Sequence, residues 1–154
     1  MTRILGVDYG ERRVGIALSD PTGTIASPLT TLPNDGRLLA SFRNIVEDHN
    51  VAEMVVGEPR TMKGEVGKRA EEARLFAARL RESFSLPVTL WDERLTSVRA
   101  HQSMLEMGMK KKQRAEKSSV DQIAAALLLQ NYLDAARIRS QREALKRSGE
   151  GTEL

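Results

Sequence analysis

The sequence predicts an α/β fold in which a mixed five-stranded sheet carries helices on both faces. Near the N-terminus, short runs rich in Val, Ile and Leu follow one another across tight turns, which is typical of antiparallel strands. From residue 38 onward, segments with apolar residues every three or four positions alternate with short apolar runs, which indicates parallel strands joined by helices. The chain has 154 residues, of which 40% are hydrophobic, so it can bury the core of one domain.

Three antiparallel strands are expected first, over residues 3–9, 13–19 and 24–32. The first two form a hairpin, because only residues 10–12 separate them. The third contains Pro28, which has no N–H group to donate to a neighbouring strand. Pro28 therefore favours an edge position, or a break, for the third strand.

The remaining elements alternate between helices and strands. In chain order, we expect a helix over 38–49, a strand over 51–57, a helix over 66–84, a strand over 87–91, a helix from Thr96 and a last long helix capped by Ser118 or Ser119. The whole is expected to form one domain over residues 1–138. A flexible basic tail is expected over residues 139–154, because that segment is polar and charged.

The composition limits the classes of partner. The net charge is only +3, but basic residues cluster before the last helix, at Lys110, Lys111, Lys112, Arg114 and Lys117. Such a cluster fits either a polyanion such as nucleic acid or a solvated loop. The chain has no cysteine, which fits a reducing compartment, and no apolar run long enough to cross a membrane. We therefore expect a cytoplasmic protein without a membrane partner.

Three acidic residues lie at the ends of predicted elements. Asp8 ends the first strand, Glu93 follows the fifth strand, and Asp121 lies in the first turn of the last helix. Ligands of open sheets gather outside the carboxyl ends of parallel strands, so these acids are expected to meet there. Carboxylate oxygens are the ligands that Mg²⁺ and Mn²⁺ prefer, and paired ions can support phosphodiester cleavage.

Each acid also has a structural interpretation. Asp8 can be a turn residue before Gly10, Glu93 can pair with Arg94, and Asp121 can belong to a capping box at the start of the last helix. Other catalytic chemistry has little support, because the chain has two histidines, no cysteine and no G-x-S-x-G motif. In the loop over 57–64, Arg60 and Lys63 are candidate phosphate contacts, although an ordinary connecting loop explains them too.

Four segments together resemble the YqgF/RuvX family, whose members have a ribonuclease H-like fold. They read "GVDYGERRVGIALSD" at 6–20, "VVGEPRTMKG" at 55–64, "DERLTS" at 92–97 and "SSVDQIAAALLLQNYLD" at 118–134. Position by position, the resemblance assigns the active-site acids of the family to Asp8, Glu93 and Asp121. This sequence departs from the family pattern at Glu58, where family members often have an apolar residue.

The resemblance implies a metal-dependent nuclease that processes the 5′ end of precursor 16S ribosomal RNA with Mg²⁺ or Mn²⁺. The family also carries the label of Holliday junction resolvase, so branched DNA stays an alternative substrate, with RNA favoured. A non-catalytic RNA-binding assembly factor is a second alternative, and an ATP-binding lobe of the sugar kinase type is a third. The sequence leaves open whether the chain acts as a monomer or as a homodimer.

Overall fold

The structure is built on a five-stranded mixed sheet, which confirms the predicted fold class. The computed structural model describes residues 2–59, 63, 66–93 and 117–151. The strands are β1 (Arg3–Tyr9), β2 (Arg13–Ser19), β3 (Ala26–Pro33), β4 (Val51–Glu58) and β5 (Val88–Asp92). The described helices are α1 (Leu38–His49), α2 (Lys68–Phe84) and α4 (Lys117–Gly151). The predicted helix from Thr96 lies outside the described residues.

The strand order β3-β2-β1-β4-β5 places β1 at the centre of the sheet. β1 pairs antiparallel with β2 and parallel with β4, while β5 extends the parallel side. β3 is an edge strand, as Pro28 predicted, and the register of the β2–β3 pair shifts between Ile16 and Ala17, next to Pro28. The carboxyl ends of β1, β4 and β5 therefore lie at one edge of the sheet.

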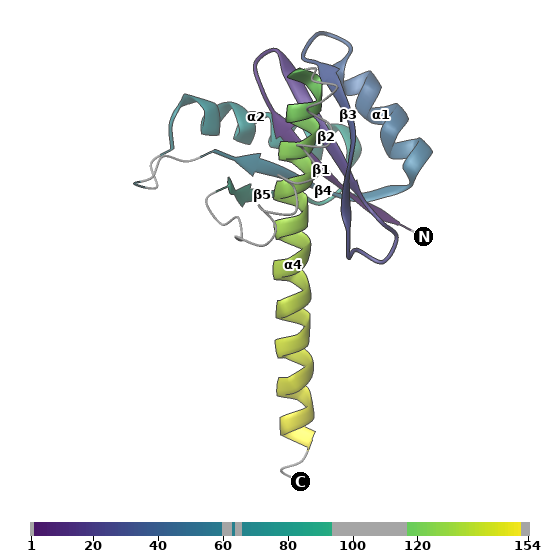
Figure 1. Cartoon of the computed structure of the whole chain (residues 1–154), viewed down its shortest axis with the longest axis vertical. Helices are drawn as coiled ribbons and strands as arrows, with labels where there is room; N and C mark the ends of the chain where they lie inside the picture. The colour runs from purple at the N-terminus through teal and green to yellow at the C-terminus, as the bar shows by residue number, and fades with distance from the viewer. Residues whose placement is uncertain (1, 60–62, 64–65, 94–116, 152–154) are drawn as a thin grey trace.

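Side chains of the sheet alternate between two apolar layers. Leu5 and Val7 of β1 face one layer, where α1 and α2 contribute Phe42 and Phe76, whose rings meet at 5.5 Å between centroids. The opposite face packs against α4 through a smaller cluster that includes Ala125 and Leu129. In Figure 1, α4 accordingly crosses one side of the sheet and the other two helices lie on the opposite side.

Glycines let α4 approach the sheet on that second face. A Cβ atom on Gly6 of β1 would lie 2.8 Å from the Cβ of Leu129, and one on Gly57 of β4 would lie 3.0 Å from the Cδ2 of Leu128. A Cβ on Gly15 of β2 would overlap the backbone carbonyl of Asp121. The first turns of α4 therefore rest directly on the sheet backbone.

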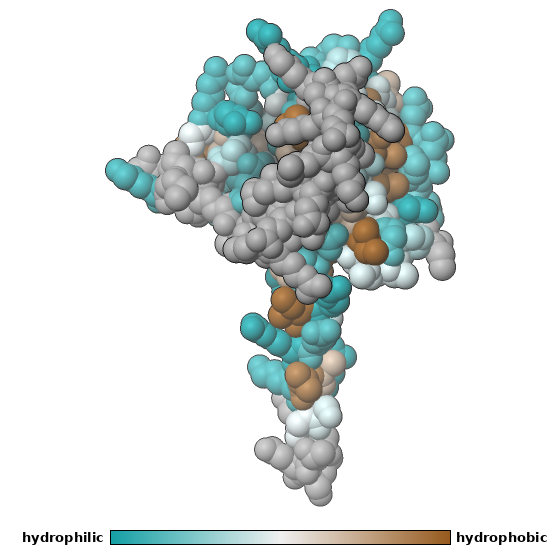
Figure 2. Space-filling model, in the orientation of Figure 1, coloured by the Kyte–Doolittle hydropathy of each residue, from teal (hydrophilic) through white to brown (hydrophobic). Residues whose placement is uncertain are grey.

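The C-terminal part of the chain, for which a flexible basic tail is expected, is helical as far as residue 151. α4 continues as a helix to Gly151, because the segment from Gln141 to Arg147 consists mostly of strong helix formers. It projects from the domain (Figure 1), and Figure 2 shows isolated hydrophobic groups on it, where Ile138 and Leu145 are 49% and 73% exposed. The division into a domain over residues 1–138 and a flexible tail over 139–154 stays a prediction.

The start of α4 also differs from the prediction. The helix begins at Lys117, so Ser118 and Ser119 lie inside it and do not precede it as capping residues. Boundaries of this kind move by one or two residues with small changes in terminal geometry. None of the described helices combines the length and apolarity that a membrane crossing requires.

The close contact of α4 with β2 makes a prediction about Gly15. Replacing Gly15 with Ala introduces a Cβ that overlaps the backbone of Asp121, so α4 must shift, and we expect a loss of about 1–3 kcal/mol in the free energy of unfolding. Urea denaturation followed by circular dichroism measures this loss. Gly36→Ala is the control, because a Cβ there meets nothing within 4 Å. Equal stability of the two variants would contradict direct packing of α4 on the sheet.

Candidate active site

Asp8 lies at the end of the central strand, on the face that α4 covers. Asp8 pairs with Gly15 of β2. It also follows Gly6 by two residues on the same strand, so Asp8 and Gly6 lie on the same face of the sheet. Burial, reinforced by the negative charge of Asp121 and opposed by the positive charge of Arg69, raises the pKa of Asp8 from 3.8 to about 6. Asp8 is therefore a half-buried carboxyl group with another acid as its neighbour.

Glu93 follows β5 and faces the same way as Trp91, which belongs to the apolar cluster under α4. A Cβ on Gly57 would lie 2.5 Å from Oε1 of Glu93, so the carboxylate lies directly against β4. Burial, the charge of Asp8 and the charge of Asp92 raise the pKa of Glu93 from 4.5 to about 7, against the opposing charge of Arg69. Glu93 and Asp8 thus share one electrostatic environment.

Asp121 comes to the same edge from α4. It is the fifth residue of that helix, and the first turn contains no acid, so the capping-box interpretation of Asp121 is wrong. Instead, Nε of Arg13 donates to Oδ2 of Asp121 at 2.8 Å. Arg13, an exposed residue at the start of β2, therefore bonds to Asp121, which lies 108 positions later in the sequence.

The three acids are neighbours, but they are not arranged as a finished set of metal ligands. Within the described part of the chain, no group of three or more Asp, Glu, His or Cys residues is placed to hold a metal ion together. The carboxylate of Asp121 is engaged by Arg13, while Asp8 and Glu93 have raised pKa values. The donor chemistry still fits a hard divalent cation, because all three residues offer oxygen and a cation would relieve their mutual repulsion.

Arg13 and Arg69 belong to this site, and sequence reasoning did not select either of them. Arg69 lies near the start of α2, and its charge lowers the pKa of both Asp8 and Glu93. No local sequence pattern pointed to Arg13, because it meets Asp121 only through a contact between distant segments. A helical arginine placed where the helix dipole disfavours cations was the one available hint at Arg69.

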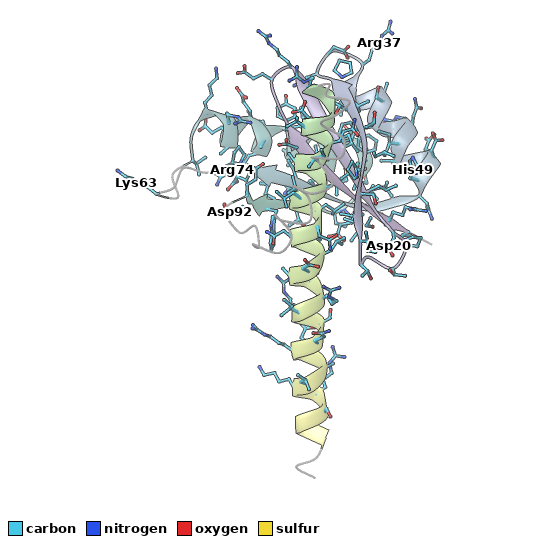
Figure 3. All side chains as sticks on the ribbon, in the orientation of Figure 1. Asp20, Arg37, His49, Lys63, Arg74 and Asp92 are labelled. Carbon is cyan, nitrogen blue, oxygen red and sulfur yellow. The ribbon has the colours of Figure 1, made fainter. Side chains whose placement is uncertain are left out.

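The predicted phosphate contacts are mostly untested. Lys63 is exposed and extends away from the body of the protein (Figure 3). Lys117 begins α4. The remaining candidates, Arg60, Lys110, Lys111, Lys112 and Arg114, lie outside the described residues.

Glu58 has a structural partner that explains its unusual position at the end of β4. It is only 4% exposed, and its Oε2 accepts a bond of 2.6 Å from Nε of Arg74 on α2. Arg74 belongs to α2, next to which Figure 3 labels it. Glu58 follows Gly57, which faces α4, so it faces the opposite side of the sheet and is not part of the acid group.

The strand order, with helices on both faces of the sheet, defines a ribonuclease H-like fold. Several solved structures have a similar fold, among them two Holliday junction resolvases. RuvC of Thermus thermophilus in complex with a Holliday junction has a TM-score of 0.56 at 16% identity, covering 89% of this chain and 96% of that one. The yeast mitochondrial Holliday junction resolvase Ydc2 has a TM-score of 0.57 at 15% identity, covering 95% and 84%.

The chain belongs to the RuvX family, also called YqgF, as its four sequence segments predicted. The family model, described as Holliday junction resolvase, matches residues 2–135. A protein of Chloroflexus aurantiacus named "Putative pre-16S rRNA nuclease" is 44% identical over 142 residues, which cover 90% of this chain and 91% of that protein. A protein of Geobacillus kaustophilus with the same name is 42% identical, covering 88% and 99%. These names are those of nucleases.

The raised pKa values predict how stability depends on pH. Between about pH 4 and pH 7, Asp8 and Glu93 bind more protons in the folded than in the unfolded chain, so the free energy of unfolding falls as pH rises. At about pH 8 both are largely ionised and the cost is nearly complete. At pH 8 in EDTA, we expect Asp8→Asn and Glu93→Gln each to stabilise the protein by on the order of 2 kcal/mol, and to change little at pH 4.

Urea denaturation at half-unit steps from pH 4 to pH 8 tests this expectation. Glu47→Gln on α1 is the matched control, because Glu47 is an exposed acid far from the sheet edge. If the stability of the wild type and that of Asp8→Asn changed with pH by the same amount, the raised pKa of Asp8 would be contradicted.

Proposed function

We propose that the protein is a metal-dependent endonuclease whose centre is formed by Asp8, Glu93 and Asp121. The observation that supports this most directly is the shared environment of Asp8, whose pKa is raised by burial and by the charge of Asp121, and which in turn raises the pKa of Glu93. Such grouping of half-buried like charges is costly to folding and typical of functional sites. A nuclease in which carboxylates hold divalent cations gives the grouping a use.

In this proposal the three carboxylates hold Mg²⁺ or Mn²⁺ in their ionised forms. A bound ion of this kind supplies Lewis acidity toward the phosphodiester and a lower pKa for the attacking water. Asp8 is fixed by the central strand and Glu93 by its position against Gly57, so neither depends on a loose loop for its placement. Arg13 orients Asp121 through the bond from Nε.

For the substrate, we propose the 5′ end of precursor 16S ribosomal RNA. The names of the bacterial relatives support RNA, since relatives that are 41–44% identical over most of the chain are named for pre-16S rRNA. Branched DNA is the second candidate, supported by the family description as Holliday junction resolvase. The third is a non-catalytic assembly factor that binds RNA through its basic residues.

The remaining attributes follow from the proposed substrate. Processing of ribosomal RNA would place the protein in the cytoplasm, and a chain without cysteine fits a reducing compartment. Cleavage of one RNA strand needs one active site, so a monomer would suffice. Symmetrical resolution of a junction would instead require a homodimer.

Substitution of Asp8 tests the proposed chemistry. We expect Asp8→Asn to reduce cleavage at least 100-fold in Mn²⁺ or Mg²⁺, because the amide removes a charged ligand while it preserves the shape of the side chain. Glu93→Gln and Asp121→Asn are expected to act in the same direction. Gel assays measure cleavage of four substrates by each variant: precursor 16S RNA, single-stranded RNA, duplex and four-way junction.

Asp48→Asn on α1 is the matched control, since Asp48 is exposed on the far side of the sheet. Full activity of Asp8→Asn would exclude the mechanism. Binding that ignores divalent cations, together with no cleavage of any substrate, would favour the assembly factor. Cleavage of the four-way junction alone would favour the resolvase.

A further inference from the structure

A cavity of about 370 Å³ adjoins the acids and is lined mainly by charged residues: Gly10, Glu11, Arg12, Arg13, Arg69 and Asp121. Its volume falls within the range of about 300–1,000 Å³ that is typical of ligand pockets. We propose that this cavity binds a phosphate group of the nucleic-acid backbone, with Arg13 and Arg69 as its contacts. The proposal rests on the proposed function, because it assigns the substrate phosphate to one side of the acid group.

Arg13 is placed to hold Asp121 and a phosphate at the same time. Its Nε bonds to Asp121 at 2.8 Å, and a guanidinium carries five N–H donors, so four donors remain beyond this bond. The side chain is 43% exposed and lines the cavity. The planar fork of a guanidinium matches phosphate oxygens, so Arg13 can connect the substrate to the orientation of Asp121.

The turn that presents Arg13 depends on Gly10. The N–H of Gly10 donates to the carbonyl of Arg13 at 3.0 Å and closes the β1–β2 turn. A Cβ on Gly10 would lie 2.6 Å from that carbonyl oxygen, so a larger residue would open the turn. The position of Arg13 at the cavity is therefore set by the backbone of the hairpin and not by its side chain alone.

Arg69 joins the cavity to the acids. Arg69 lines the cavity, and its positive charge also lowers the pKa of both Asp8 and Glu93. It therefore influences the acids while it remains available to a ligand in the cavity. Arg69 is the second residue of α2, where the helix dipole disfavours a cation. A basic residue that opposes the local helix dipole, and that lines a cavity beside half-buried acids, fits ligand binding better than helix stability.

The charge balance favours a phosphate over other ligands. Asp8, Glu93 and Asp121 repel an anion at the sheet edge, so a phosphodiester can approach only where cations offset them. Arg12, Arg13 and Arg69 supply three fixed positive charges around the cavity. Glu11, the other acid of the lining, faces Lys68 at 3.9 Å. An anion is thus accommodated beside the acids on the arginine side.

Binding without divalent cations tests the proposal. Fluorescence anisotropy in EDTA, at several salt concentrations, measures the affinity of the full chain for a single-stranded RNA of defined sequence. We expect Arg69→Ala to weaken binding roughly tenfold and to reduce the slope of log affinity against log salt by about 0.7–1, the value for one lost phosphate contact. Arg13→Ala is expected to do the same, and Arg69→Lys to restore the slope more than the affinity.

Arg79→Ala is the matched control, because Arg79 is an exposed arginine of the same helix that does not line the cavity. Circular dichroism melting of each variant checks that it is folded. A 5′-phosphorylated and a 5′-hydroxyl oligonucleotide are compared, and an equal effect of Arg69→Ala on both supports an internal phosphate. An effect restricted to the phosphorylated one would overturn that assignment.

Arg13 and Arg69 variants that keep the wild-type affinity and salt slope would overturn the proposal, as would a wild-type chain that binds none of the oligonucleotides. These results are independent of cleavage. Metal-dependent cleavage with unchanged binding in the arginine variants would refute the phosphate site and leave the nuclease. Altered binding without cleavage of any substrate would refute the nuclease and leave the phosphate site.

Discussion

The contact between α4 and the sheet backbone determines where the chemistry of this protein can lie. Gly6, Gly15 and Gly57 remove the side chains that would keep the helix at an ordinary distance. As a result, the start of α4 lies against β2, and Asp121 reaches the edge where Asp8 ends the central strand. Gly57 likewise leaves room for the carboxylate of Glu93, which lies against β4. The acid group is therefore a consequence of close backbone packing.

This packing imposes an electrostatic cost. Carboxyl groups that lie near one another and away from water favour the protonated form, which is why the pKa values of Asp8 and Glu93 rise to about 6 and 7. Arg69 opposes part of this cost from an exposed position, and Arg13 bonds to Asp121. The apolar layer around Phe42 and Phe76 lies on the other face of the sheet. It stabilises the fold through apolar burial and does not include the acid group.

Much of the fold could be predicted because it follows from local patterns. The hairpin of β1 and β2, the helix over 38–49 and the edge position of the strand with Pro28 all matched, since side-chain period, turn residues and a missing N–H act within a few residues. The division into a domain and a flexible basic tail stays a prediction. The structure adds that the segment after Arg139, which contains strong helix formers, continues α4.

The acids were candidates because of their positions at the ends of elements. Parallel pairing of β1, β4 and β5 brings Asp8 and Glu93 to one edge of the sheet, and the packing of α4 brings Asp121 there. The sequence by itself thus determined most of the strands and helices, the antiparallel and parallel parts of the sheet, and which acidic residues were candidates for the site. Only the tertiary structure decided that Asp121 bonds to Arg13 instead of capping its helix, that Glu58 turns away to Arg74, and that Arg69 faces the acids. Each of these contacts joins segments that lie far apart in the chain or on different elements, and no local pattern encodes the distance between them.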